Sequence, residues 1–153
     1  KFHGVEHRIE FVREIDGVKY YNDSIATTPT RAIAGLNSFK QKVILIAGGY
    51  DKKIPFTELA KVGVDKVKVL ILIGTTAQKI EDEFIKEMNT RGINGDELPI
   101  IRVTSLEDAI NIARENARPG DIVTLSPACA SFDMYKNFEE KGNKFKEVVN
   151  NLR

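Results

Sequence analysis

The chain has 153 residues, 42% of them hydrophobic, which predicts one domain with a proper hydrophobic core. Its 23 Lys and Arg residues nearly balance its 22 Asp and Glu residues, so its charge favours neither nucleic acid nor an anionic membrane as a partner. A single cysteine, Cys129, excludes an internal disulfide and favours a reducing compartment such as the cytoplasm, and no apolar run is long enough to span a bilayer. Because the sequence begins at Lys1, almost inside a strand pattern, we expect a piece of a longer protein.

The first predicted elements are a β-hairpin and a helix. Residues 8–13 alternate between polar and apolar side chains, Asp16-Gly17 predicts a tight turn, and residues 18–21 return as the second strand. Thr28 and Pro29 have the residue types of an N-cap and a first helical position.

Buried strands and helices alternate through the middle of the chain. Residues 43–47 are all apolar, which predicts a central parallel strand, and residues 67–73 predict a second buried strand. A short helix should follow the Gly48-Gly49 turn. Thr75 with Gln78 resembles a capping box at the start of the next helix. The inward residues of that next helix would be Ile80, Phe84 and Met88.

The last third of the chain continues the alternation. Residues 99–103 predict a short strand, and Thr104 with Glu107 predicts the cap of a helix. Residues 121–125 predict another buried strand, and a final helix should begin near Asp133. The whole pattern predicts an α/β fold with a doubly wound, mostly parallel, Rossmann-like sheet, helices on both faces and an N-terminal hairpin.

Ligands of doubly wound folds bind beyond the carboxyl ends of the strands. The loops at this edge would be residues 22–28, 48–53, 74–76 and 126–131.

Three of these loops carry groups that suit an anionic or hydroxylated ligand. The small residues 126–131 should lead into a helix N-terminus that attracts an anion, although a plain strand-to-helix connection is the alternative. Asp23 and its small neighbours suit ribose hydroxyls or a carboxylate ligand, although Thr28 in the same loop also serves as a helix cap. Lys52 would pair with a carboxylate or phosphate, or else be solvated surface.

Other kinds of site find less support. The phosphate-binding patterns G-x-x-x-x-G-K-[ST] and G-x-G-x-x-G do not occur, so any nucleotide must be held mainly by something outside this chain. Cys129 has no histidine placed to activate it, and the two histidines with the one cysteine lack the spacing of zinc ligands.

Four motifs, in order along nearly the whole chain, resemble the C-terminal domain of the Mur ligases. They are His7-Arg8-Ile-Glu, Asn22-Asp-Ser-x-Ala-Thr27, Ile46-Ala-Gly-Gly-x-Asp-Lys52 and Leu125-Ser-Pro-Ala-Cys-Ala-Ser-Phe-Asp-x-Tyr-Lys-Asn-Phe-Glu-x-x-Gly142. The last motif is the most specific, and it resembles the family member that adds D-glutamate.

The resemblance implies a cytoplasmic enzyme of peptidoglycan synthesis. In that enzyme, ATP phosphorylates the carboxylate of UDP-N-acetylmuramoyl-L-alanine, and the amine of D-glutamate attacks the acyl phosphate, releasing phosphate and ADP. Residues 1–153 would be its third domain, inactive alone, without the UDP-binding and central ATPase domains. ATP and Mg²⁺ would be held mainly by the central domain, and no metal ligand is expected in this chain.

The resemblance also implies roles for individual residues. Arg8 would contact the ATP phosphates and Asp23 the ribose. The carboxylates of D-glutamate would be held by Thr27, Lys52, Ser131 and the backbone around Phe138. Ile25 departs from the family pattern, which usually has lysine after Asp-Ser, so Lys52 or Lys53 would carry more of the charge.

Two other hypotheses stay open. The chain would be a stand-alone small-molecule-binding module if its natural gene ended at both boundaries of the chain. It would be the same domain of a related ligase, such as the L-alanine-adding or folylpolyglutamate enzymes, if the Asp23 loop had their longer acidic and histidine-containing form, which is absent.

Overall fold

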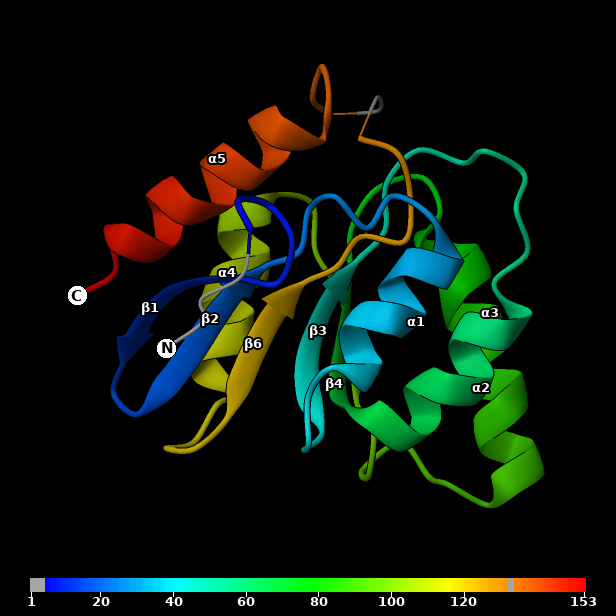
Figure 1. Ribbon diagram of the computed structural model, residues 1–153. Coiled ribbons are helices and arrows are strands. Elements are labelled where there is room, and N and C mark those ends of the chain that lie inside the picture. Colours follow the sequence, from blue (N-terminus) through cyan, green and yellow to red (C-terminus); the bar gives the residue numbers. More distant parts are fainter. Residues whose placement is uncertain (1–4, 132–133) are drawn as a thin grey trace.

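The computed structural model describes residues 5–131 and 134–153, and Figure 1 shows one sheet surrounded by helices. The elements are β1 (Glu10–Ile15), β2 (Val18–Asn22), α1 (Pro29–Asn37), β3 (Val43–Ala47), α2 (Thr57–Lys66), β4 (Val67–Leu72), α3 (Ala77–Arg91), β5 (Ile100–Arg102), α4 (Leu106–Glu115), β6 (Ile122–Leu125) and α5 (Phe138–Asn150). No helix in these two described stretches is long and apolar enough to cross a bilayer.

The six strands lie in the order β1-β2-β6-β3-β4-β5, and all neighbours pair in parallel except β1 with β2. The antiparallel β1–β2 pair is the hairpin predicted from the sequence. Strand β3 occupies an interior position with every residue buried, as its uninterrupted apolar run predicts. The mostly parallel sheet is therefore confirmed.

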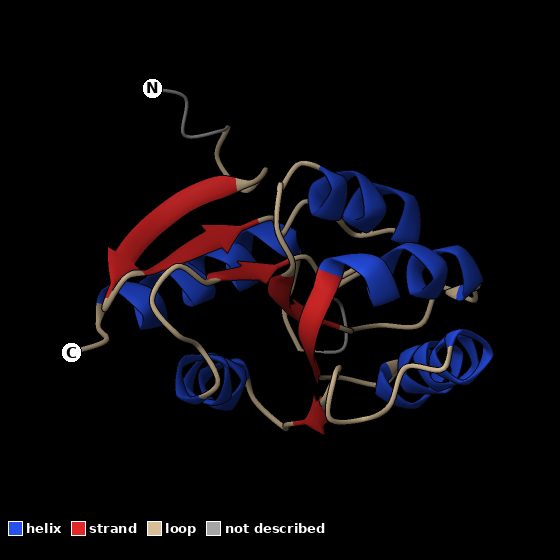
Figure 2. Ribbon diagram, turned by 90° about the horizontal axis from the view of Figure 1, so that it is seen from below, coloured by secondary structure: helices blue, strands red, loops and turns tan. Residues whose placement is uncertain are grey.

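Alternating side chains divide the core into two layers, one on each face of the sheet. On β3, Leu45 packs with α1, α2 and α3, whereas Ile44 and Ile46 pack on the opposite face with α4 and α5. Figure 2 shows the helices on both sides of the strands. This arrangement confirms the doubly wound fold and leaves the loops at the carboxyl ends of the parallel strands free to form a site.

Two of the predicted helix caps are wrong. The Thr75–Gln78 capping box does not form, because α3 begins after Thr76 and the Thr75 hydroxyl donates to the carbonyl of Gly49. Helix α4 is capped by Ser105, whose hydroxyl accepts from the backbone N–H of Asp108, and not by Thr104 with Glu107. The Thr28 cap and Pro29 at the first turn of α1 are confirmed.

The final helix begins later than the sequence predicts. Its first residue is Phe138, and the side chain of Asn137 caps it by accepting from the N–H of Glu140. Before it, the carbonyl of Ser131 accepts the N–H groups of Met134 and Tyr135. Asp133, the predicted start, lies outside the described residues.

Candidate functional site

A buried carboxylate stands at the carboxyl end of β2. Asp23 is 4% exposed, and its oxygens accept from the Ser126 hydroxyl at 2.9 Å and from the Ile9 N–H at 3.1 Å. Burial raises the pKa of Asp23 to about 6, and the two hydrogen bonds and the nearby charges of Arg8 and Arg31 offset only part of this effect. Asp23 is thus mostly ionised at neutral pH but is held in an environment that penalises its charge.

The backbone that supplies one of these hydrogen bonds is itself strained. Ile9 has a φ of 47°, a left-handed conformation that β-branched residues rarely adopt. Its N–H nevertheless points at the Asp23 carboxylate. Strain of this kind persists where the surrounding structure fixes it, and it is typical of functional sites.

Asp23 opens into a cleft of about 300 Å³. Arg8 and Arg31 both line this cleft, so the structure brings together the two residues predicted to bind ATP, Arg8 and Asp23, and adds a second guanidinium. The lining residues also include Ile25 and Gly35. Gly35 allows α1 to pass close to the carboxylate, since a Cβ atom at this position would overlap Asp23 Oδ2.

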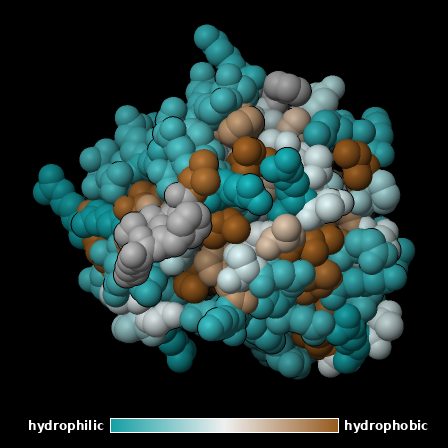
Figure 3. All heavy atoms as spheres, viewed as in Figure 1, coloured by the Kyte–Doolittle hydropathy of each residue, from teal (hydrophilic) through white to brown (hydrophobic). Residues whose placement is uncertain are grey.

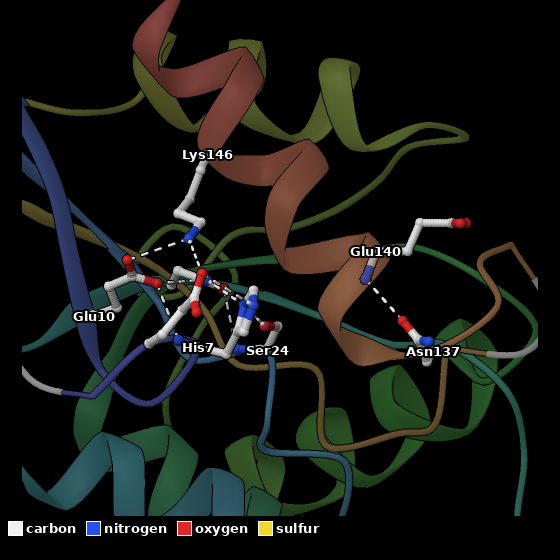
Figure 4. Close-up of polar contacts among 8 residues, drawn as sticks. His7, Glu10, Ser24, Asn137, Glu140 and Lys146 are labelled. Atoms are coloured by element: carbon white, nitrogen blue, oxygen red, sulfur yellow. Dashed lines mark hydrogen bonds and ion pairs between the residues drawn. The ribbon is translucent and has the colours of Figure 1, made fainter.

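A buried histidine connects the cleft to α5. His7 Nδ1 lies 3.0 Å from Asn22 Nδ2 and 3.2 Å from Ser24 Oγ, and Figure 4 shows the His7 and Ser24 side chains facing each other. The His7 ring also meets the ring of Phe138 edge to face, with centroids 5.9 Å apart. A Cβ on Gly142 would overlap the side chains of both His7 and Ser24, so a glycine is needed at this position of α5.

The hairpin and α5 are joined by charges beside this histidine. Lys146 on α5 reaches Glu10 on β1, as Figure 4 shows, and also pairs with Glu6. Burial raises the pKa of the Glu10 carboxyl. Hydrogen bonds from the His7 backbone, Asn22 and Lys146 together lower this pKa by more than burial raises it, so the net shift is downward.

Three loops at the ends of β3, β4 and β6 interlock through their backbones. The Gly48 N–H donates to the carbonyl of Pro127, and the Gly49 N–H donates to the Thr76 hydroxyl. Behind them, the fully buried Lys141 donates from Nζ to the carbonyl of Gly48 at 3.0 Å. Cys129 is 2% exposed and lies beside Thr76, so it is not presented to solvent as a nucleophile.

The residues predicted to hold D-glutamate divide between these loops and α5. The Ala128 N–H donates to the carbonyl of Ala26, which sets the Thr27 segment against the 126–131 loop. The Tyr50 N–H donates to the carbonyl of Ala130, which sets the Lys52 loop against the same segment. The structure therefore brings the loops of Thr27, Lys52 and Ser131 together, whereas Phe138 lies against His7 on the side of the Asp23 cleft.

Ser131 and Lys52 have polar groups without partners in the described structure. The Ser131 side chain is 2% exposed, and among residues 5–131 and 134–153 its hydroxyl has no hydrogen-bond partner. The ammonium of exposed Lys52 likewise makes no hydrogen bond or ion pair there. A buried hydroxyl without a partner is costly for the folded state. The expected helix N-terminus, however, is not directly after Ser131, because α5 begins seven residues later.

A melting experiment on this chain tests whether the Ser131 hydroxyl stabilises the fold, for example by capping a helix, or is free to bind a ligand. Ser131→Ala removes a hydroxyl that has no partner among the described residues, so the free energy of unfolding should stay the same or rise by up to about 1 to 3 kcal/mol. Asn137→Ala, the matched control, should lose about 1 kcal/mol because Asn137 does cap α5. Thermal melts of both variants measure the two changes in stability. A loss of stability in Ser131→Ala would mean that its hydroxyl stabilises the fold.

Sequence reasoning missed several residues of this region. The sequence pattern indicates only that Ser126 is small, whereas its hydroxyl, directly after a buried strand, is a hydrogen-bond partner of Asp23. Arg31 carried a signal, because a cation in the first turn of a helix opposes the helix dipole. Lys141 carried none, since its burial depends on the approach of Gly48.

Hydrophobic surface and clusters of potential metal ligands are two further features of the described residues. On the face seen in Figure 3, hydrophobic residues form several small areas among hydrophilic ones. Among the described residues, no group of three or more His, Cys, Asp or Glu side chains is placed to hold a metal ion.

Comparison with known proteins identifies the family. Residues 7–129 match the model of the Mur ligase glutamate ligase domain, which takes in Arg8, Asp23 and Lys52 but ends before Ser131. The chain belongs to the Mur ligase family. The predicted resemblance is therefore confirmed.

Relatives within the Mur ligase family are close in sequence. The UDP-N-acetylmuramoylalanine–D-glutamate ligase of Clostridium novyi (strain NT) is 64% identical over 151 residues, and that of Acetivibrio thermocellus is 63% identical. Both matches take in 99% of this chain but 32% of the relative. The chain thus spans about a third of the length of these relatives.

Solved structures share the fold at low sequence identity. A murein peptide ligase of Psychrobacter arcticus 273-4 aligns with a TM-score of 0.63 and 16% identity, over 99% of this chain and 32% of its own. The folylpolyglutamate synthase/dihydrofolate synthase of Yersinia pestis, solved with AMPPNP and a Mn ion, aligns with a TM-score of 0.63 and 15% identity, over 95% of this chain and 32% of its own. These likenesses confirm the α/β fold.

Proposed function

We propose that this chain is the C-terminal domain of a longer cytoplasmic ligase that uses ATP to add D-glutamate to UDP-N-acetylmuramoyl-L-alanine in peptidoglycan synthesis. The observation that carries the proposal is the identity of 64% to a D-glutamate ligase over 99% of this chain. The domains absent here would bind the UDP group and hold most of the ATP with its Mg²⁺. This division fits a chain without a phosphate-binding loop.

The Asp23 cleft would contribute to the ATP site. A buried carboxylate can accept hydrogen bonds from both hydroxyls of a ribose, and Asp23 is fixed for this by Ser126 and Ile9. The exposed Arg8 guanidinium in the same cleft would pair with the phosphates. Closing the cleft over ATP would place the transferred phosphate next to the substrate carboxylate and exclude water from the acyl phosphate.

The interlocked loops would bind D-glutamate. Lys52 offers a cation to one carboxylate, and Ser131 offers a buried hydroxyl that lacks a partner among the described residues. The Thr27 hydroxyl and the backbone near Phe138 would supply further hydrogen bonds. Holding both carboxylates leaves the amine free to attack the acyl phosphate in a fixed orientation.

The D-glutamate assignment can be tested at Lys52 in the full-length enzyme. Lys52→Ala removes a charge-assisted hydrogen bond, so the KM for D-glutamate should rise about tenfold or more while the KM for ATP stays nearly unchanged. Lys61→Ala is the matched control, because Lys61 is also exposed but lies on α2, where it pairs with Glu58. Steady-state kinetics with each substrate varied in turn measure both values. An unchanged dependence on D-glutamate in Lys52→Ala would contradict the role.

A further inference from the structure

A second arginine faces the Asp23 cleft from α1. Arg31 lines the cleft together with Arg8 and Asp23, and these three are the charged residues of the lining in the described structure. Within residues 5–131 and 134–153, the guanidinium groups of Arg8 and Arg31 make no hydrogen bond and no close ion pair. Two unpaired cations therefore border a cleft with one buried carboxylate, which leaves the cleft electropositive at neutral pH.

The place of Arg31 in its own helix gives no stabilisation, although its charge offsets part of the burial cost of Asp23. It lies in the first turn of α1, where the helix dipole disfavours a cation, and no acidic residue in that turn offsets the charge. Its backbone is nevertheless fixed, because its N–H donates to the Thr28 hydroxyl and Pro29 begins the helix. A rigid helix thus holds an exposed cation at the rim of a cleft, which is the arrangement that a bound anion would use.

We propose that Arg31 binds the phosphate groups of the nucleotide, together with Arg8, and so contributes to ATP affinity. This inference rests on the proposed function, because it assumes that the cleft binds ATP. A planar guanidinium can donate two parallel hydrogen bonds to a phosphate, which an ammonium group cannot. Arg31 would therefore be a binding residue whose effect depends on its geometry as well as on its charge.

Binding of ADP to the full-length enzyme tests the inference by isothermal titration calorimetry. Arg31→Ala should weaken ADP binding about tenfold, and Arg31→Lys should recover only part of this loss. Arg118→Ala is the matched control, because Arg118 is also exposed and lies before β6, at the opposite end of the parallel strands. The wild type should also lose more affinity than Arg31→Ala when KCl is raised from about 50 to about 300 mM.

Two outcomes would overturn the inference, and a further variant separates it from the proposed function. Equal ADP affinity in Arg31→Ala and wild type would exclude Arg31 from the site. A weaker affinity with an unchanged salt dependence would exclude a phosphate contact. Arg8→Ala must weaken ADP binding if the cleft is part of the ATP site. Loss in Arg8→Ala without loss in Arg31→Ala therefore rejects only the role of Arg31, whereas no loss in either variant rejects the ATP assignment of the cleft.

Discussion

Gly48→Ala should destabilise the chain by about 3 to 5 kcal/mol, the largest effect that we expect from any single methyl group here. Gly48 has a φ of 112°, which disfavours any residue with a Cβ atom, and that atom would overlap the backbone carbonyl of Ile73. A backbone carbonyl in a strand connection cannot rotate away as a side chain can. The substitution should also separate Gly48 from Pro127 and Lys141, which hold the three loops together.

A second glycine separates the steric clash from the backbone preference. Gly120 has a φ of 97°, but a Cβ at this position would meet nothing within 4 Å. Gly120→Ala should therefore lose only about 1 to 2 kcal/mol, the cost of the left-handed conformation. Urea unfolding of both variants measures the two values. Equal losses would show that the Ile73 carbonyl moves aside and that the loops are less rigid than the structure indicates.

Asp23→Asn should stabilise the chain at pH 7 while it weakens ATP binding by the full-length enzyme. The folded-state pKa of about 6 lies above the ordinary value of 3.8 for an aspartate, so the folded state binds the proton more tightly than the unfolded state. This tighter binding stabilises the fold fully below the unfolded pKa, and the benefit is lost as the pH rises through 6. At neutral pH the ionised carboxylate therefore costs up to about 3 kcal/mol, which a neutral amide avoids.

The pH dependence provides the check on Asp23. The stability of Asp23→Asn relative to the wild type should be about 3 kcal/mol higher at pH 7 than below the unfolded pKa, and about half of this difference should remain at pH 5. Chemical unfolding of the chain across this range measures the difference. The kinetic counterpart is a rise in the KM for ATP, since the amide offers one acceptor oxygen where the carboxylate offers two. A stability difference that does not vary with pH would mean that the carboxylate is not penalised by burial.

The parts of the fold that local sequence determines were predictable. The apolar run of β3 could only be a buried strand, and Thr28-Pro29 fixes the start of α1 by local chemistry alone. The placement of the candidate site followed from topology, because parallel strands end at one edge. The capping residue of α4 was harder to predict, because both Thr104 and Ser105 can cap a helix. Only the path of the backbone selects Ser105.

Tertiary contacts decided what the sequence left open. The late start of α5 coincides with its cap at Asn137, which no periodicity encodes. The contact of His7 with Ser24 joins residues from the two sides of the hairpin, and the second cation of the cleft depends on how closely α1 approaches Asp23. Such contacts join residues that are distant in the sequence or set by helix packing, so a one-dimensional pattern carries little information about them.

The glycines of α1 and α5 also limit how this domain can be engineered. Replacing helical glycine by alanine is a common route to greater heat resistance, because alanine gains about 0.5 to 1 kcal/mol in an ordinary helix. At Gly35 the added methyl group would displace the Asp23 carboxylate, and at Gly142 it would push against His7 and Ser24. A library built on helix propensity would therefore disturb the Asp23 cleft at Gly35 and the contact of His7 with Ser24 at Gly142, and thermostable variants should be sought on the outward faces of these helices.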